Sequence, residues 1–309
     1  MLSRFRKETP PLELYGKLPI AKDYLRIGGG RGAGIALRDW VDQSFSTRVE
    51  RGESAMLAWP GRFLVAHYSG EPLLGCSWPS SDTGGHRRFP FLAFIERRRR
   101  ALANEWSAGG SALRPLWDHL VGAYTSHQSY GDGQTFLSAM RGQEIVVGDG
   151  PTPEVERVDF ELWHGGLWPD AGVDPLVEVL ASLTELGRGR TEGPIRLPLL
   201  AGLPLVPQVH AWWTALADLR LVESGAVPSV FFPLPDADAN VPQFATFLLG
   251  ALHPEHQAWL APPTSPLGPG DFAFPEPRRI DGAGPASEAT PPLAESMRGP
   301  LISARARSA

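Results

Sequence analysis

Short apolar runs broken by turn-forming residues fill the first hundred positions of the chain. Each run is long enough for a β-strand, and Pro, Gly, Ser and Asp stand between consecutive runs. This pattern predicts an antiparallel meander with strands at 12–18, 56–59, 62–68, 73–78 and 91–95. Two later segments, 195–200 and 229–234, are further strand candidates because they are short apolar runs bounded by turn residues.

Longer segments between and after these runs show apolar positions at helical spacing. Leu37, Trp40 and Val41 begin such a stripe, and Asp174-Pro175 has the N-cap and first-position chemistry of a helix start. We predict helices at 35–51, 113–127, 174–186, 206–219 and 243–252, and another that begins at the arginine run 97–100. The segment 28–34 should be irregular, because its many glycines are entropically unfavourable inside an element. The segment 155–163 fits either a strand or a helix.

Strands that come mainly early, with helices between and after them, favour an α+β fold. We predict an α/β sandwich in which helices flank a mainly antiparallel central sheet. Residues 1–11 read as an N-terminal lead-in and 12–261 as the globular domain. The last segment, 262–309, is dominated by Pro, Gly, Ala and Ser, so we expect a disordered low-complexity tail.

Composition and charge limit the classes of function that the chain can have. The chain has 309 residues, 42% of them hydrophobic, and a formal charge of −5, which gives no reason to expect a nucleic-acid partner. Neither a signal peptide nor an apolar stretch of about 20 residues is present, so we expect a cytoplasmic protein without a membrane-spanning segment. The single cysteine, Cys76, lies in an apolar run and is best interpreted as a buried thiol.

The search for catalytic chemistry finds only incomplete motifs. Gly28-x-Gly30-x-x-Ala33 approaches a dinucleotide fingerprint, but no apolar strand precedes it. His164-Gly-Gly lacks the nucleophile elbow of the esterases, and His253 with His256 lacks the spacing and partners of a helical zinc site. We therefore predict no catalytic residue, no metal and no cofactor. A nucleotide-binding enzyme or sensor that uses the Gly28–Gly34 loop stays open as the alternative.

The loop 79–91 combines turn formers with cationic side chains, in the order Pro-Ser-Ser-Asp-Thr-Gly-Gly-His-Arg-Arg-Phe-Pro-Phe. It is either an ordinary connection or a recognition loop held on a rigid sheet. In the second case Arg87 and Arg88 offer planar forks to carboxylates of a partner, with Phe89 as an anchor. Asp82 could equally pair with one of these arginines and lock the loop. The sequence leaves both interpretations open.

Two stretches carry a family signature. Tyr15-Gly-Lys-Leu-Pro-x-x-x-Asp-Tyr24 and Pro79-Ser-x-Asp-x-x-Gly85, followed by Arg87-Arg-Phe-Pro90, resemble the two N-terminal blocks of the TagF/ImpM family of type VI secretion-associated proteins. Asp39-Trp40, the Trp-rich segment 211–213 and the segment 228–232 are similar to further family features. His86 is an insertion relative to the family block, which leaves open which arginine has the family's role.

The resemblance implies a non-enzymatic cytoplasmic accessory protein that acts as a negative, post-translational regulator of type VI secretion assembly. It implies that the partner is the forkhead-associated scaffold protein of the apparatus. Weak peripheral membrane contact through Arg97–Arg100 is a further hypothesis. The residues expected to form the partner surface, or to hold it, are Gly16, Lys17, Leu18, Pro19, Asp23, Tyr24, Trp40, Pro79, Ser80, Asp82, Gly85, Arg87, Arg88, Phe89 and Pro90.

Overall fold

The computed structural model describes residues 10–28, 32–50, 61–66, 70–107, 109–143, 145, 193–199, 204–218, 221–222, 226–234, 243–250 and 252–260. Its centre is one eight-stranded sheet with the order β2-β1-β5-β4-β3-β7-β8-β6, and every pair of neighbours is antiparallel. The strands are β1 (Glu13–Gly16), β2 (Leu25–Ile27), β3 (Gly61–Val65), β4 (Leu73–Trp78), β5 (Phe91–Glu96), β6 (Gly193–Leu199), β7 (Val230–Pro233) and β8 (Gln243–Leu249).

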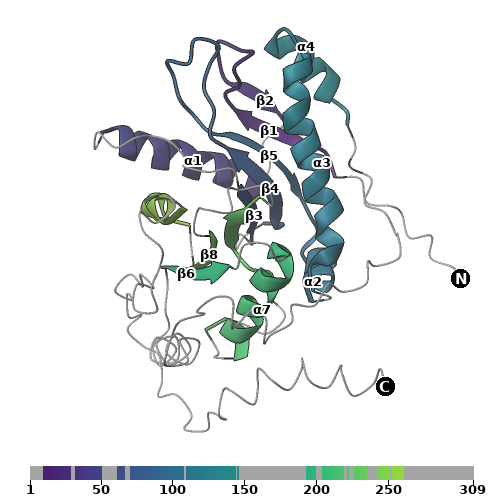
Figure 1. Ribbon diagram of the computed structural model, residues 1–309, viewed down its shortest axis with the longest axis vertical. Coiled ribbons are helices and arrows are strands. Elements are labelled where there is room, and N and C mark those ends of the chain that lie inside the picture. The colour runs from purple at the N-terminus through teal and green to yellow at the C-terminus, as the bar shows by residue number, and fades with distance from the viewer. Residues whose placement is uncertain are drawn as a thin grey trace, which may run out of the picture.

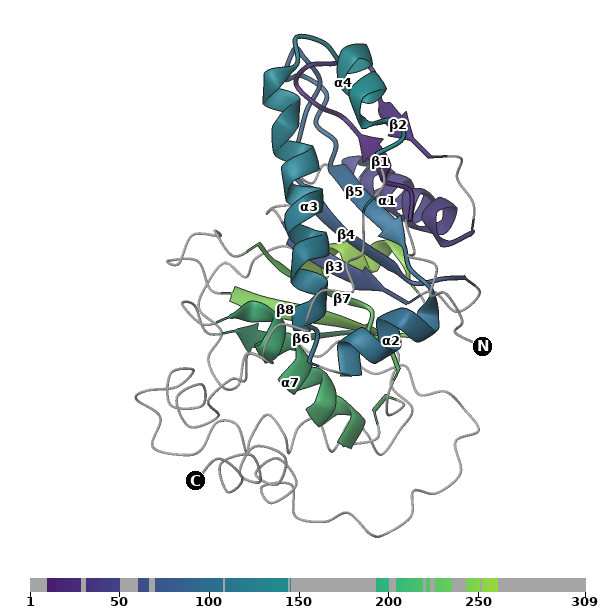
Figure 2. The ribbon, with the colours of Figure 1, turned by 90° about the vertical axis from the view of Figure 1, so that its right-hand side faces the viewer.

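Helices cover both faces of the sheet, with α1 on one side and α3 on the other (Figure 1). The turned view in Figure 2 shows α3 running along the sheet, with α2 and α7 towards one end and α4 at the other. The helices are α1 (Gly32–Glu50), α2 (Arg99–Ser107), α3 (Arg114–Thr125), α4 (Gly133–Met140) and α7 (Leu205–Asp218). The short 3-10 helices are η1 (Ser111–Leu113), η2 (Ser126–Ser129) and η3 (Pro254–Leu260).

Alternate side chains of the central strands enter two separate apolar cores. In β5, for example, Phe91, Ala93 and Ile95 belong to the core under α3, whereas Leu92 and Phe94 belong to the smaller core under α1. This is the period of two that a strand with both faces buried must show. The predicted α+β sandwich with an antiparallel sheet is confirmed.

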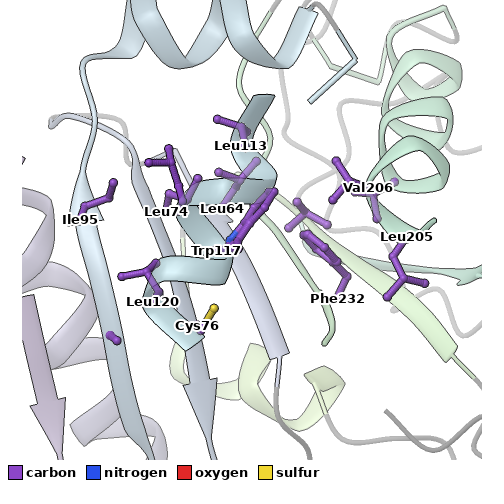
Figure 3. Close-up of a cluster of buried hydrophobic side chains, with 14 of the residues drawn as sticks. Leu64, Leu74, Cys76, Ile95, Leu113, Trp117, Leu120, Leu205, Val206 and Phe232 are labelled. Carbon is purple, nitrogen blue, oxygen red and sulfur yellow. The ribbon is translucent and has the colours of Figure 1, made fainter. Parts of the chain in front are cut away.

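The larger core lies between β3, β4 and β5 on one side and the helices α3 and α7 on the other. Figure 3 shows Trp117 of α3 between Leu64 and Phe232, with Leu113 and Leu120 above and below it along the helix. The indole N–H of Trp117 donates to the carbonyl of Gly75 at 3.2 Å, so its one polar atom is satisfied inside the core. Cys76 lies fully buried in the same layer, which confirms the interpretation of a buried thiol.

The strands predicted at 12–18, 62–68, 73–78 and 91–95 are confirmed, with ends shifted by a few residues. The helices predicted at 35–51, 113–127 and 206–219 are confirmed in the same way. The predicted helix at 243–252 is wrong, because this segment forms β8 between β7 and β6. Phe244, Phe247 and Leu248 fit a helical stripe, but in β8 Phe247 and Leu248 enter opposite cores. The apolar positions of a short buried run fit both the period of two of a strand and the period of 3.6 of a helix, so the sequence alone does not distinguish them.

Two smaller differences concern glycines. Gly32–Gly34 belong to α1, so the irregular segment predicted at 28–34 ends earlier than expected. Gly133 begins α4, which the sequence pattern missed because the helix is only eight residues long. Asp132 caps it by accepting from the amides of Gln134 and Thr135, both at 2.9 Å.

Several predictions fall outside the described residues. These are the strand at 56–59, the ambiguous segment 155–163, the helix at 174–186, His164 and the tail 262–309. Within the part of the chain that the structure describes, no helix is both long and apolar enough to cross a membrane.

Candidate functional site

The two signature stretches form connections at the same end of the sheet. The β1–β2 connection (17–24) and the β4–β5 connection (79–90) leave from Gly16, Trp78 and Phe91, which are neighbours across three strands. Both connections lie near the upper end of the sheet in Figures 1 and 2. The amide of Thr83 donates to the carbonyl of Ala21 at 3.0 Å, so the two connections are bonded to one another. We call this pair of connections the signature surface.

Asp82 organises the β4–β5 connection from within. Its Oδ1 accepts from the amides of His86 and Arg87 at 3.1 and 3.3 Å, and its Oδ2 accepts from Nε of Arg87 at 2.7 Å. The amide of Asp82 donates in turn to the carbonyl of Arg87 at 3.1 Å. The Arg87 side chain, and then the amide donors, hold the pKa of Asp82 below its usual value. The interpretation of Asp82 as the residue that locks the loop is confirmed.

Arg87 also ties this connection to the neighbouring one. Its Nη2 donates to the carbonyl of Lys22 at 2.5 Å and lies 3.7 Å from a carboxylate oxygen of Asp23. The arginine that pairs with Asp82 is therefore the first of the pair, despite the inserted His86. Arg88 forms an isolated backbone bridge with Ser81, and its side chain is exposed.

Gly16 allows the two connections to approach each other at their base. Its φ is +128°, and a Cβ built there would lie 2.0 Å from the carbonyl oxygen of Pro90. No L side chain fits such a position, so the Gly-Lys-Leu-Pro block begins with a residue that the backbone requires.

An aromatic cluster lies beside these connections, on the α1 side of the sheet. Tyr24 packs edge-on against Phe89 with ring centroids 4.8 Å apart, and Phe45 of α1 contacts Phe89 at 4.9 Å. Phe89 is only 2% exposed, whereas Tyr24 is 48% exposed. The prediction that Phe89 anchors a partner is therefore wrong, because this ring is buried in its own chain. Tyr24 is the aromatic ring that a partner can reach.

Helix α1 is bonded to this cluster by half-buried polar side chains. The hydroxyl of Tyr15 donates to the carboxylate of Asp42, with both oxygens within 2.8 Å. Burial raises the pKa of Asp42, and burial together with this hydrogen bond raises the pKa of Tyr15. The sequence pattern did not single out Asp42 and Phe45 as site residues. The signal that was available is their position on the helix predicted at 35–51, three residues apart and therefore on one face.

The predicted site residues divide into two groups. The first group lies inside the fold and consists of Gly16, Lys17, Leu18, Trp40, Asp82, Phe89 and Pro90. Trp40 is part of the smaller core, where its indole donates to the carbonyl of His253 at 2.7 Å, and it is not a surface residue. The second group is half-buried or exposed and consists of Pro19, Asp23, Tyr24, Pro79, Ser80, Gly85, Arg87 and Arg88.

The glycine-rich segment has acidic neighbours. The amide of Gly34, near the start of α1, donates to the Glu96 carboxylate at 3.2 Å, and a Cβ at Gly28 would meet the Glu13 side chain at 2.7 Å. Two carboxylates beside a helix N-terminus oppose a bound phosphate group, which requires unoccupied amides and positive charge. Residues 29–31 of the loop lie outside the described ranges.

The remaining predicted features are placed as follows. His253 and His256 face each other with ring centroids 5.1 Å apart. Among the described residues, no group of three or more His, Cys, Asp and Glu side chains could hold a metal ion.

Arg97, the first residue of the arginine run, is buried against Glu105, and Arg99 donates to the carbonyl of Gly70 at 2.9 Å. Arg97 is therefore withdrawn from the surface, whereas Arg98, Arg99 and Arg100 are exposed. Membrane contact through this run stays a prediction.

A comparison with protein families gives the segment its identity. Residues 13–131 match the family described as TagF N-terminal domain, type VI secretion system-associated. This segment is a TagF N-terminal domain. The resemblance seen in the two signature stretches is confirmed, and both stretches lie within the matched range. The TagF match ends just after α3 and η2, whereas β6, β7 and β8 of the same sheet come from residues 193–249.

Solved structures add two weak likenesses. The crystal structure of PA0076 from Pseudomonas aeruginosa PAO1 is 17% identical with a TM-score of 0.45, and the match covers 84% of this chain and 99% of that one. The structure of an RNA-binding light-oxygen-voltage receptor is 9% identical with a TM-score of 0.14, and the match covers 81% and 98%. Neither supports a functional inference. No curated protein matches the sequence.

Proposed function

We propose that this protein is a non-enzymatic cytoplasmic regulator that restrains the assembly of a type VI secretion apparatus. It acts after translation, by binding the forkhead-associated scaffold protein of the apparatus through the signature surface. The TagF N-terminal domain at 13–131 supports the link to type VI secretion.

One observation carries the choice of surface. Arg87, held by the buried Asp82, and the amide of Thr83 bond the two connections together, and Tyr24 and Arg88 are left exposed upon them. Tyrosine and arginine are the side chains most often responsible for binding energy in protein interfaces. A surface that is ordered before binding loses little conformational entropy on binding, which favours affinity. A rigid support with an exposed tyrosine and arginine is therefore suited to protein recognition.

The partner can be tested with the full chain and the forkhead-associated scaffold protein of the same secretion system. We expect calorimetry to give a complex with a dissociation constant in the micromolar range or tighter, as is usual for specific interfaces. In cells, deletion of the gene should increase secretion of type VI substrates. Absence of binding, together with unchanged secretion, would rule out the proposed function.

A charge-removing variant tests the surface. Because the Arg88 side chain is exposed, Arg88→Ala should leave the fold intact and weaken binding about tenfold, the effect of one lost interface arginine. Arg114→Ala is the matched control, since Arg114 is also exposed and lies at the α2 end of α3, away from the signature surface (Figure 1). Equal affinities for the two variants would exclude Arg88 from the interface.

A further inference from the structure

The signature surface is positively charged, although the chain as a whole is negative. Its two connections carry four cationic side chains and two carboxylates, whereas the formal charge of the whole chain is −5. The cations are Lys17, Lys22, Arg87 and Arg88, and the acids are Asp23 and Asp82. Lys17 is buried, and the other three cations are exposed. A local surplus of one charge attracts groups of the opposite charge.

The acids of this region already have donors of their own. Asp82 accepts from two amides and from Nε of Arg87, and Asp23 lies 3.7 Å from Nη2 of the same arginine. Asp132, at the start of the adjacent helix α4, accepts from two amides of that helix. Arg87 is therefore the cation that the acids of the signature surface neutralise.

Lys22 and Arg88 are the exposed cations of this surface that have no acidic partner. Within the part of the chain that the structure describes, no carboxylate pairs with either side chain. The two residues lie on backbone segments that are bonded to each other, because Arg87, which precedes Arg88, donates to the carbonyl of Lys22. The closed β4–β5 connection therefore keeps two unneutralised charges on adjoining segments of the signature surface.

We propose that the signature surface binds an acidic segment of the protein partner, with one carboxylate at Arg88 and another at Lys22. This assignment rests on the proposed function and adds the chemistry that the partner presents. Arginine binds a carboxylate through two parallel N–H donors, and lysine contributes a compact charge. Exposed charges of this kind mainly increase the rate of association, because they attract the partner before contact.

The small number of cations favours a protein over the other anionic partners. Nucleic acids and anionic membranes present extended arrays of phosphate groups, and their binding sites carry many cations along a face or a helix. The signature surface has three exposed cations, one of them already paired with Asp82, on a chain with a formal charge of −5. A short acidic protein segment is therefore the partner that fits it best.

Charge reversal at the two unpaired cations tests this assignment. Lys22→Glu/Arg88→Glu and the control Arg100→Glu/Arg114→Glu make the same change in net charge, and all four side chains are exposed. Arg100 and Arg114 lie in α2 and at the α2 end of α3, towards the other end of the sheet (Figure 2). With the forkhead-associated scaffold protein as partner, surface plasmon resonance measures the rates. We expect the association rate constant to fall at least about tenfold for the first variant and less than about threefold for the control.

Ionic strength gives a second readout that needs no variant to fold. Between about 0.01 M and about 1 M salt the screening length falls from about 30 Å to about 3 Å. Association of the unmodified chain should slow at least about tenfold over this range, whereas association of Lys22→Glu/Arg88→Glu should not slow. The unmodified complex can also be treated with a carbodiimide, which joins an amine to a carboxylate in contact. We expect Lys22 joined to an Asp or Glu of the scaffold protein.

The possible outcomes separate this assignment from the proposed function. Equal association rates for the two double variants, or rates of the unmodified chain that do not depend on salt, would overturn the acidic partner segment while the proposed function stands. Binding of duplex DNA or of phosphatidylserine vesicles that is tighter than binding of the scaffold protein, and that Lys22→Glu/Arg88→Glu abolishes, would assign the surface to phosphate groups instead. If the unmodified chain does not bind the scaffold protein, the proposed function fails and this assignment fails with it.

Discussion

At the scale of single residues, the signature surface depends on one carboxylate and one arginine. Asp82 is buried among three donors, two amides and the Nε of Arg87, and these donors belong to residues four and five positions further along the chain. Arg87 then reaches the carbonyl of Lys22 in the other connection. The pair therefore closes its own loop and also sets the distance between the two connections.

Replacement of the Asp82 carboxylate tests whether it closes the β4–β5 connection. Asp82→Asn retains one acceptor oxygen but loses the charge that pairs with Arg87, so we expect the melting temperature at pH 7 to fall by a few degrees. The folded-state pKa of Asp82 lies below its unfolded value, so the stability it contributes is complete above the unfolded pKa and is lost as the pH falls through the folded one. The difference in melting temperature between wild type and Asp82→Asn should therefore shrink below about pH 4.

Differential scanning fluorimetry at a series of pH values measures this difference. Asp23→Asn is the control, because the Asp23 side chain is 89% exposed and stands 3.7 Å from the same arginine. A gap between wild type and Asp82→Asn that persists unchanged at pH 3 would contradict the assigned role of the carboxylate.

At the scale of elements, the sheet depends on contacts that neither the turn residues nor the spacing of apolar residues predicts. Gly75 in β4 lies opposite Phe63 in β3, and the Phe63 ring fills the space where a side chain at Gly75 would stand. The carbonyl of the same glycine accepts from Trp117 of α3. One residue without a side chain thus permits a close packing of strand against strand and accepts a hydrogen bond from the helix above.

Two glycine variants with opposite expected signs test this packing. A Cβ at Gly75 would lie 2.1 Å from the Phe63 ring, so Gly75→Ala should destabilise the fold by about 1–3 kcal/mol. A Cβ at Gly122 in α3 would meet nothing within 4 Å, so Gly122→Ala should stabilise by up to about 1 kcal/mol through helix propensity. Urea denaturation of both variants measures the two effects, and equal midpoints would refute the steric account.

At the scale of the whole molecule, the sheet joins two distant parts of the chain. β3 lies between β4 and β7, so a strand from the region 61–65 is covered on one edge by a strand from 230–233. Phe232 packs edge-on against Trp117 with ring centroids 5.4 Å apart, which extends the larger core across the same junction. The strands that follow the TagF N-terminal domain are therefore needed to complete its sheet and its core.

A truncated chain should reveal this dependence. The fragment 1–143 retains the TagF match but loses β6, β7, β8 and α7, which exposes the edge of β3 and the apolar surface around Trp117. We expect it to aggregate, or to lack the cooperative unfolding transition of the full chain. Circular dichroism measures the unfolding transition, and size-exclusion chromatography measures aggregation. A monodisperse fragment that melts cooperatively would show that the N-terminal part folds without the later strands.

The sequence by itself determined the meander, the helices α1, α3 and α7, the buried Cys76 and the two signature stretches. These depend on period, on turn residues and on local composition, which act over a few positions along the chain. The position of β8 required the tertiary structure, because a short apolar run between two strands buries both of its faces and loses its alternation. The arginine that pairs with Asp82 and the burial of Phe89 also required it. Each depends on which connections meet at one end of the sheet, and that is fixed by contacts between residues up to several tens of positions apart.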